Sequence, residues 1–311
     1  MARPDQIAVF ILLVMFLLFY SGDNLTAKKI HNALYTKDFK LNLDQVSYKD
    51  KLLKIDKVYS VIDYAPVSNL TAKAVYVYVK DDNIVLYQKN QDLKIFPASL
   101  TKIITAITAL QFYDLDDVVK VSRTITEGRV MGIFPGQRFS VENLLYAILI
   151  HSANDAAFAL ADSAGFDNFI NQMNKTAVDL GMTNSHFTNP AGFDDLNHYT
   201  TVKDLAKAVN FFLKDPFLKK TVGIKEITVS DIEYKTFYRL ENVNQLLGDI
   251  PGVAGLKTGF TPNAGENLIT LYKHNSAGDI VVILVGSLDR FTETRAVINW
   301  LNTNVVVSFV N

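Results

Sequence analysis

The order of strand-like and helix-like segments along the chain is the feature that most constrains its fold. Alternating apolar and polar residues over 72–90 predict two strands joined at Asp81-Asp82-Asn83. Helical periodicity then runs through residues 141–213, and strand-like alternation returns over 226–240. Two further strands, 267–272 and 279–286, are predicted to be joined around residues 275–278. Strands at both ends, with helices between them, predict one sheet assembled from distant segments with a helical subdomain inserted into it. We therefore expect an α/β (α+β) fold with a mainly antiparallel sheet flanked by helices.

The spacing of apolar residues sets where the individual helices are expected. A helix over residues 100–112 follows soon after the first hairpin, and Thr201 fits the N-cap of a later helix. A closing helix over 290–301 contains Trp300, the only tryptophan of the chain. The remaining predicted helices cover residues 141–151, 154–163, 166–180 and 201–213.

The composition excludes several classes of function. The 311 residues carry a formal net charge of -1, which gives no electrostatic case for a nucleic-acid partner. There is no cysteine, so disulfides, thiolate catalysis, cysteine zinc sites and a lipidated N-terminal cysteine are excluded. The five histidines show no metal-ligand spacing, and we expect neither a metal site nor a cofactor.

The N-terminal region holds an unbroken apolar run, Ile7 to Tyr20, preceded by a single positive residue, Arg3. The run is short for a membrane span but long enough for the apolar core of a signal peptide. No Ala-x-Ala cleavage site follows it. Residues 1–22 are therefore expected to be a removed signal peptide or an uncleaved membrane anchor, with a buried core helix as the third alternative. Under the first two, the following chain lies outside the cytoplasmic membrane, either anchored to its outer face or secreted.

Two further segments are expected to lie outside the folded domain. Residues 23–68 are rich in lysine and lack a sustained apolar period, so they predict a solvated linker, or alternatively a segment near anionic lipid headgroups or polymers. Residues 306–311 are expected to be a tail. The domain itself is then predicted to cover residues 69–305, with its helical subdomain at about 113–220.

Ser99-Leu-Thr-Lys102 stands at the start of the first predicted helix, which places its serine and lysine on the same face one turn apart. A serine hydroxyl is a poor nucleophile until a base removes its proton. A lysine whose ammonium form is disfavoured by burial or by neighbouring positive charge is such a base near neutral pH. Taken alone, the motif also fits a helix cap beside a solvated lysine.

Ser152-Ala-Asn154 falls at the junction of two apolar helices, where buried polar groups are costly unless they are paired. The hydroxyl of Ser152 can relay a proton between Lys102 and a leaving amine, and the carboxamide of Asn154 can bind a peptide backbone. Alone, this triplet also fits an ordinary turn between helices.

Lys257-Thr-Gly259 lies next to the predicted strands at the C-terminal end of the domain. A cation, a hydroxyl and a residue without a side chain on an edge strand suit a carboxylate terminus lying against exposed backbone. The backbone N–H of Phe260 would then lie beside that of Ser99, and two converging N–H groups are what a tetrahedral oxyanion requires. The alternative for this motif alone is a glycine-punctuated loop.

The three motifs occur in this order within longer matching blocks. The chain resembles the serine D-Ala-D-Ala carboxypeptidases, the low-molecular-mass penicillin-binding proteins of peptidase S11 type, over about residues 70–305. The resemblance implies a β-lactamase/transpeptidase-like fold. The blocks that carry it are PASLTKIITA, PGQRFSVENLLYAILIHSANDAAFALAD, FINQMNKTAVDLGMTNSHFTNPAGFDDLNHYTTVKDLA and GLKTGFTPNAGENL.

The resemblance also implies roles for individual residues. It implies that Ser99 is the acylated nucleophile, that Lys102 is its base and that Ser152 relays the proton. Arg290 matches, by its spacing in the closing helix, an arginine that contacts the terminal carboxylate of the substrate, and Arg295 is the second candidate. The other substrate-binding positions that it implies are Asn154, Lys257, Thr258, Gly259 and Phe260.

The implied activity is removal of the terminal D-Ala from peptidoglycan stem peptides, with β-lactam antibiotics as covalent inhibitors of Ser99. The alternatives are a D,D-endopeptidase that cleaves peptidoglycan cross-links, and a non-catalytic peptidoglycan-binding relative. A β-lactamase is disfavoured because we find no Glu-x-x-Leu-Asn-like segment. Phe260 stands where several family members have histidine. No C-terminal β-domain is expected, so a membrane anchor would have to be the segment Ile7 to Tyr20.

Overall fold

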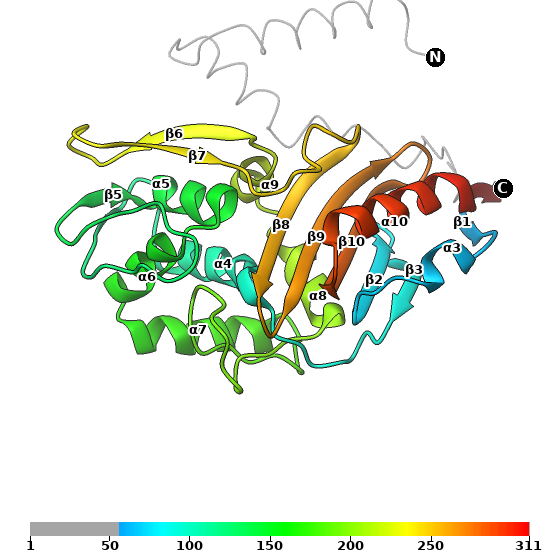
Figure 1. Cartoon of the computed structure of the whole chain (residues 1–311), viewed down its shortest axis with the longest axis horizontal. Coiled ribbons are helices and arrows are strands. Elements are labelled where there is room, and N and C mark those ends of the chain that lie inside the picture. The colour runs from blue at the N-terminus through cyan, green and yellow to red at the C-terminus, as the bar shows by residue number, and fades with distance from the viewer. Residues whose placement is uncertain (1–55, 311) are drawn as a thin grey trace, which may run out of the picture. The chain divides into compact units, whose positions relative to one another are not determined.

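A five-stranded antiparallel sheet forms the centre of the computed structural model, which describes residues 56–310 (Figure 1). The strand order is β3-β2-β10-β9-β8, and each neighbouring pair is antiparallel. The predicted N-terminal hairpin therefore pairs directly with strands from the other end of the domain, which confirms the sheet expected from the sequence. The strands are β2 (Ala74–Val79), β3 (Ile84–Lys89), β8 (Val253–Thr261), β9 (Gly265–His274) and β10 (Gly278–Ser287).

Strand β10 is buried on both faces because helices cover both sides of the sheet. Alternate residues of a strand point to opposite faces. Val281 and Ile283 accordingly belong to one apolar cluster with α4 and α8, whereas Val282 and Leu284 belong to a second cluster with α10. In Figure 1, α10 crosses one face of the sheet and α4 and α8 lie behind the other. The domain thus has two cores, one on each side of the sheet.

The helices largely follow the predicted ranges, and the N-cap predicted at Thr201 is present. Thr201 accepts a hydrogen bond from the Asp204 N–H, which confirms its prediction as an N-cap. Ser140 and Asp215 cap two other helices in the same way. The helices are α3 (Ala65–Ser68), α4 (Lys102–Phe112), α5 (Val141–Tyr146), α6 (Asn154–Ser163), α7 (Phe166–Asp179), α8 (Val202–Phe212), α9 (Pro216–Val222) and α10 (Arg290–Asn304).

The limits predicted for the domain were wrong at both ends. Strand β1 (Asp56–Val61) and α3 lie in the predicted linker, and β11 (Val305–Val310) occupies most of the predicted tail. The two strands pair with each other as a separate antiparallel ribbon. Neither was recognised from its own sequence, because the hydrogen bonds that define each strand come from the opposite end of the described region.

The inserted subdomain was predicted to be all-helical, but it also contains strands. A short strand pair, β4 (Val118–Lys120) with β5 (Arg138–Ser140), lies within it. A second hairpin, β6 (Glu226–Ser230) with β7 (Phe237–Glu241), follows it and confirms the alternation predicted there. Strands of three residues carry too little periodicity to be separated from loops by sequence alone.

Within residues 56–310, no helix combines the length and the hydropathy needed to cross a membrane. The apolar run Ile7 to Tyr20 and most of the predicted linker lie outside the described residues.

Candidate active site

Ser99 lies in a 3₁₀ turn, η2 (Ala98–Thr101), that leads directly into α4. The Lys102 ammonium donates hydrogen bonds to Ser99 Oγ at 2.9 Å, to Asn154 Oδ1 at 2.7 Å and to the Ala191 carbonyl at 2.8 Å. These three acceptors match the three protons of an ammonium group. The predicted serine and lysine pair is thus brought together, and Asn154 joins it.

Lys102 is completely buried, and this burial lowers its pKa to about 7, against the opposing attraction of the Asp155 carboxylate. An ordinary exposed lysine is almost entirely protonated at that pH. A large part of Lys102 is therefore a neutral amine near neutral pH, within hydrogen-bonding distance of the Ser99 hydroxyl.

The turn that carries Ser99 is supported from behind by His198. The Thr188 N–H donates to His198 Nδ1 at 3.0 Å, so Nε2 carries the ring proton and donates to Thr101 Oγ1 at 2.8 Å. Burial lowers the pKa of His198 to about 4, which keeps the ring neutral. Gly192 packs so closely here that a Cβ would lie 1.8 Å from the Ala98 carbonyl oxygen. The backbone on either side of the nucleophile is therefore fixed.

Ser152 follows a π-helical segment, η3 (Ala147–His151), rather than the continuous α-helix predicted through residue 151. Its backbone adopts the left-handed conformation, with φ of 65°, which is uncommon for a residue other than glycine. Such strained positions cluster at functional sites. The Ser152 Oγ accepts a hydrogen bond from Lys257 Nζ at 2.8 Å, which joins the second predicted motif to the third.

Lys257 is the second buried lysine of the site. Its ammonium also donates to the Thr258 carbonyl at 3.1 Å. Its pKa is well below the usual value, first because of burial and then because of the positive charges of Lys102, Arg290 and Arg129. The positive charge of either lysine therefore disfavours protonation of the other.

The backbone of β8 runs directly beside the nucleophile at Gly259. A Cβ at this position would lie 3.1 Å from the Ser99 nitrogen and 3.2 Å from the Pro97 carbonyl oxygen. Glycine therefore allows the strand to approach the Ser99 N–H closely, as the motif predicts. The side chain of Phe260, the next residue, is 59% exposed and lies at the rim of the pocket.

The structure distinguishes the two arginine candidates. Arg290 begins α10 and donates from Nη1 to the Gly259 carbonyl at 2.9 Å, so it lies against β8. Arg295 forms an ion pair with Asp249 and is not among the residues that line the pocket. Arg290 is the candidate that reaches the site.

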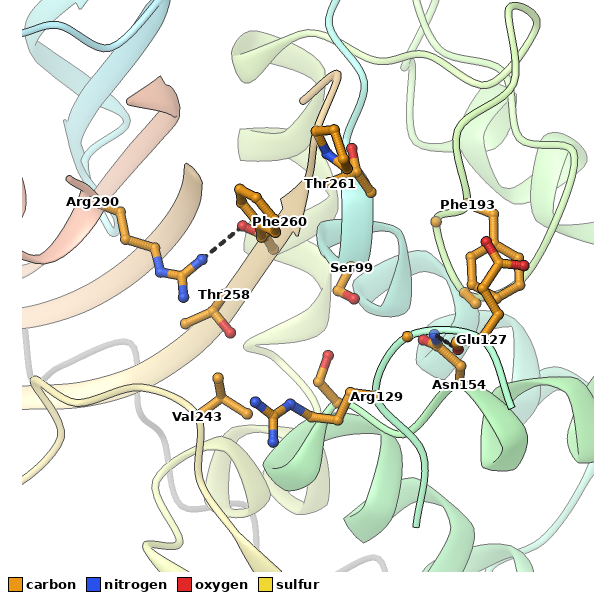
Figure 2. A pocket seen from close by; sticks show the side chains of 16 residues that line it. Ser99, Glu127, Arg129, Asn154, Phe193, Val243, Thr258, Phe260, Thr261 and Arg290 are labelled. Atoms are coloured by element: carbon orange, nitrogen blue, oxygen red, sulfur yellow. Dashed lines mark hydrogen bonds between the residues drawn. The ribbon is translucent and has the colours of Figure 1, made fainter. Parts of the chain in front are cut away.

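These side chains surround one pocket of about 400 Å³ (Figure 2). Thr258, Phe260 and Arg290 lie on one side of Ser99 in this view, and Asn154 with Phe193 lies on the other. Lys102 and Lys257 are buried beneath the surface and do not line it. The predicted residues that do line it are Ser99, Ser152, Asn154, Thr258, Gly259, Phe260 and Arg290.

Sequence reasoning missed the remaining walls of the pocket. One wall comes from the segment TEGR at residues 126–129, before the second motif. Another comes from PAGF at residues 190–193, which lies within one of the blocks that resemble the family. Neither segment has a periodic pattern, although the glycine in each is a signal of close backbone approach. The missed residues are Glu127, Gly128, Arg129, Ala191, Gly192, Phe193, Val243, Thr261 and Pro262.

The arrangement contains the parts needed for acyl transfer. It offers a serine hydroxyl, a buried amine with a lowered pKa beside it, a second hydroxyl, and a strand edge close to the Ser99 backbone N–H.

Comparison with known proteins agrees with this chemistry. Residues 62–287 match the profile of the family described as D-alanyl-D-alanine carboxypeptidase, Peptidase S11. The chain is similar to D-alanyl-D-alanine carboxypeptidase DacF of Bacillus subtilis, with 33% identity over 225 residues, covering 70% of this chain and 58% of that relative. It is also similar to a D-alanyl-D-alanine endopeptidase of Pseudomonas aeruginosa, with 29% identity over 242 residues, 74% of this chain and 77% of the relative.

Among solved structures, penicillin-binding protein D2 from Listeria monocytogenes in its ampicillin-bound form matches with a TM-score of 0.66 and 28% identity, over 75% of this chain and 98% of that chain. The match to the Bacillus subtilis carboxypeptidase spans less than two thirds of that protein's length. The family match nevertheless covers most of the sequence and includes all three motifs. The chain therefore belongs to the D-alanyl-D-alanine carboxypeptidase family, Peptidase S11.

Proposed function

We propose that this protein is a serine-type D-alanyl-D-alanine carboxypeptidase, which removes the terminal D-Ala of peptidoglycan stem peptides through an acyl-enzyme on Ser99. The observation that carries the proposal is the contact of 2.9 Å between Lys102 Nζ and Ser99 Oγ, made by a lysine whose pKa is lowered to about 7. A neutral amine in this position is a general base for the hydroxyl.

In the acylation step, Ser99 Oγ attacks the carbonyl carbon of the penultimate D-Ala while Lys102 accepts the hydroxyl proton. The resulting oxyanion is stabilised by the backbone N–H groups of Ser99 and Phe260. The C–N bond then breaks, and the proton passes through Ser152 to the departing amine, so that free D-Ala leaves. A water molecule next attacks the ester with Lys102 again as base, which releases the shortened peptide and restores Ser99.

Substrate binding is assigned to the rest of the predicted set. Asn154 contacts the peptide amide, and Gly259 keeps the edge of β8 open so that the peptide can lie along it. Lys257, Thr258 and Arg290 provide positive charge and a hydroxyl for the terminal carboxylate.

We also propose that β-lactams acylate Ser99, in line with the ampicillin-bound structure of the Listeria relative. The protein would act outside the cytoplasmic membrane, because its substrate is there. Residues 1–22 would be the signal peptide or anchor, and the segment from residue 23 to the start of β1 would be the linker to the domain.

A second candidate function is a D,D-endopeptidase, because one relative of similar identity carries that name. The same groups would cleave a peptide cross-link, with a bulkier leaving amine. The two activities are separated by product analysis on a stem pentapeptide and on a cross-linked dimer.

The test is labelling with fluorescent penicillin together with release of D-Ala from an N-acylated peptide that ends in D-Ala-D-Ala. Wild type should do both, and Ser99→Ala should do neither. Ser122→Ala is the matched control, since Ser122 is exposed and bonds to Asp162 outside the pocket. Labelling that survives in Ser99→Ala would remove the nucleophile assignment. Peptide binding without D-Ala release by wild type would favour a non-catalytic relative.

A further inference from the structure

Arg129 is a pocket residue to which the motifs assign no role. Its main chain is held firmly, because the Asn154 N–H donates to the Arg129 carbonyl at 2.7 Å and Asn154 Nδ2 donates to the Glu127 carbonyl at 2.7 Å. The backbone N–H groups of the residues that follow, Met131, Gly132 and Ile133, donate to the Asp155 carboxylate at distances between 2.8 and 3.1 Å. The segment that carries Arg129 is thus fixed by Asn154, which belongs to the second motif, and by Asp155, the residue that follows it.

The close packing at Gly128 adds to this restraint. Its φ is 70°, and a Cβ would lie 2.6 Å from Asn154 Nδ2. Glycine at this position lets the segment lie against Asn154, whose other amide atom contacts Lys102. Arg129 therefore starts from a backbone whose position relative to the catalytic lysine is set.

The side chain of Arg129 lines the pocket, and its guanidinium lies near Val243 and below Thr258 in the view of Figure 2. It makes no ion pair or side-chain hydrogen bond with another residue in the 56–310 region. The other arginines in this region are engaged. Arg290 bonds to the Gly259 carbonyl, and the remaining pairs are Arg123 with Asp162, Arg138 with Glu233, Arg239 with Glu226 and Arg295 with Asp249.

Positive charge is concentrated at this end of the pocket. Burial is the main cause of the lowered pKa of both Lys257 and Arg290, and the nearby charge of Arg129 lowers both further, whereas the Glu266 carboxylate raises the pKa of Arg290. Glu127, the acidic residue that lines the pocket, lies toward Phe193 and away from this group in Figure 2. A guanidinium that is unpaired within the described residues and lies near a second guanidinium is stabilised by an anion bound between the two.

We infer that Arg129 is a further substrate-binding residue, which acts with Arg290 from the opposite wall of the pocket to hold the free carboxylate of the departing D-Ala. The two guanidinium groups flank Thr258 in Figure 2. A carboxylate at that position accepts hydrogen bonds from both and from the Thr258 hydroxyl. This inference rests on the proposed carboxypeptidase function, because it concerns the same site and the same substrate.

The test compares two substrates that differ in the carboxylate alone: an N-acylated peptide ending in D-Ala-D-Ala, and the same peptide as its C-terminal amide. Arg129→Gln should lower kcat/KM for the acid by about tenfold, the size expected for a charge-assisted hydrogen bond, and change the amide by less than about twofold. Arg129→Lys should recover part of the loss, since it restores the charge without the planar fork. Arg239→Gln is the matched control, because it removes the same charge from an exposed site outside the pocket.

Equal losses on the acid and the amide in Arg129→Gln, or no loss on either, would overturn the inference. Failure of the proposed function gives a different pattern. In that case wild type itself releases no D-Ala and Ser99 is not labelled by penicillin. Retained penicillin labelling of Arg129→Gln, together with an unchanged melting temperature, shows that the variant is folded and its nucleophile intact.

Discussion

The pH dependence of acylation tests the buried lysine most directly. Lys102 must be a neutral amine to accept the proton of Ser99, and its pKa is lowered to about 7 by burial. The acylation rate should therefore level off above about pH 7 and fall by about tenfold for each pH unit below it. Acid-side inactivation of this kind reports protonation of the base and not unfolding.

The size of the effect follows from comparison with an exposed lysine. At the ordinary pKa of 10.5, only about 0.03% of the side chain would be neutral at pH 7, whereas a pKa of about 7 makes about half of it neutral. Burial thus raises the reactive fraction by roughly 10³-fold. A general base contributes about 10²–10⁴-fold to a rate, so removing the amine should cost an amount within that range.

The assay is the second-order rate constant for acylation by fluorescent penicillin between about pH 5 and about pH 9, with folding followed by circular dichroism. Lys102→Met should acylate at least about 10²-fold more slowly and lose the inflection near neutral pH. Lys203→Met, which removes a partly exposed lysine that pairs with Asp92 outside the pocket, should behave as wild type. A flat wild-type profile, an inflection near the ordinary lysine pKa, or a Lys102→Met variant that acylates at the wild-type rate would refute the reasoning.

Three further predictions concern stability and packing. The pKa of Lys102 is lower in the folded protein than in the unfolded chain, so the unfolded chain binds more protons between about pH 7 and the ordinary value of 10.5. The unfolding free energy of wild type relative to that of Lys102→Met should therefore rise with pH across that window. Urea titrations at several pH values measure this difference, and a difference that stays constant with pH would contradict the prediction. Gly259→Val should lower penicillin acylation by about 10²-fold and the unfolding free energy by about 1–3 kcal/mol, because its side chain is forced against the buried backbone of the Ser99 turn; near-normal acylation by the folded variant would contradict this close approach. His198→Leu should lower the unfolding free energy by about 1–3 kcal/mol, since the Thr188 N–H and Thr101 hydroxyl lose their buried partner, and an unchanged denaturation midpoint would argue against this support.

The central part of the fold could be predicted because its signals are local. The hairpin around Asp81-Asp82-Asn83 and the helix capped by Thr201 carry their own turn and capping residues, and both are found where they were expected. Strands β1 and β11 could not be found in this way. Their pairing joins the two ends of the described region, and neither segment carries a local pattern that requires the other.

The same division applies to the site. Ser99 and Lys102 share one helical turn, so their contact follows from spacing alone. The bond between Ser152 and Lys257 joins residues 105 positions apart, and it was not predicted from the sequence, because no local pattern relates two such distant positions. Arg129 was missed because its place in the pocket is set by hydrogen bonds from Asn154 to the backbone, which no side-chain pattern records.

The position of β8 at the edge of the sheet links the fold to the proposed chemistry. An edge strand has unpaired backbone groups, and proteins usually cover or interrupt such edges because they invite pairing with other chains. Here the stretch Thr258–Thr261 lines the pocket instead, with Gly259 against the Ser99 turn and Phe260 at the rim. Under the proposed function, a peptide that adds to this edge would satisfy those groups and be aligned by them with its carbonyl toward the nucleophile. In the function that we propose, the open edge is therefore the element that makes the serine and lysine pair a site for peptides. It also explains why the third motif has glycine at this position, since a Cβ would lie only 3.1 Å from the Ser99 nitrogen.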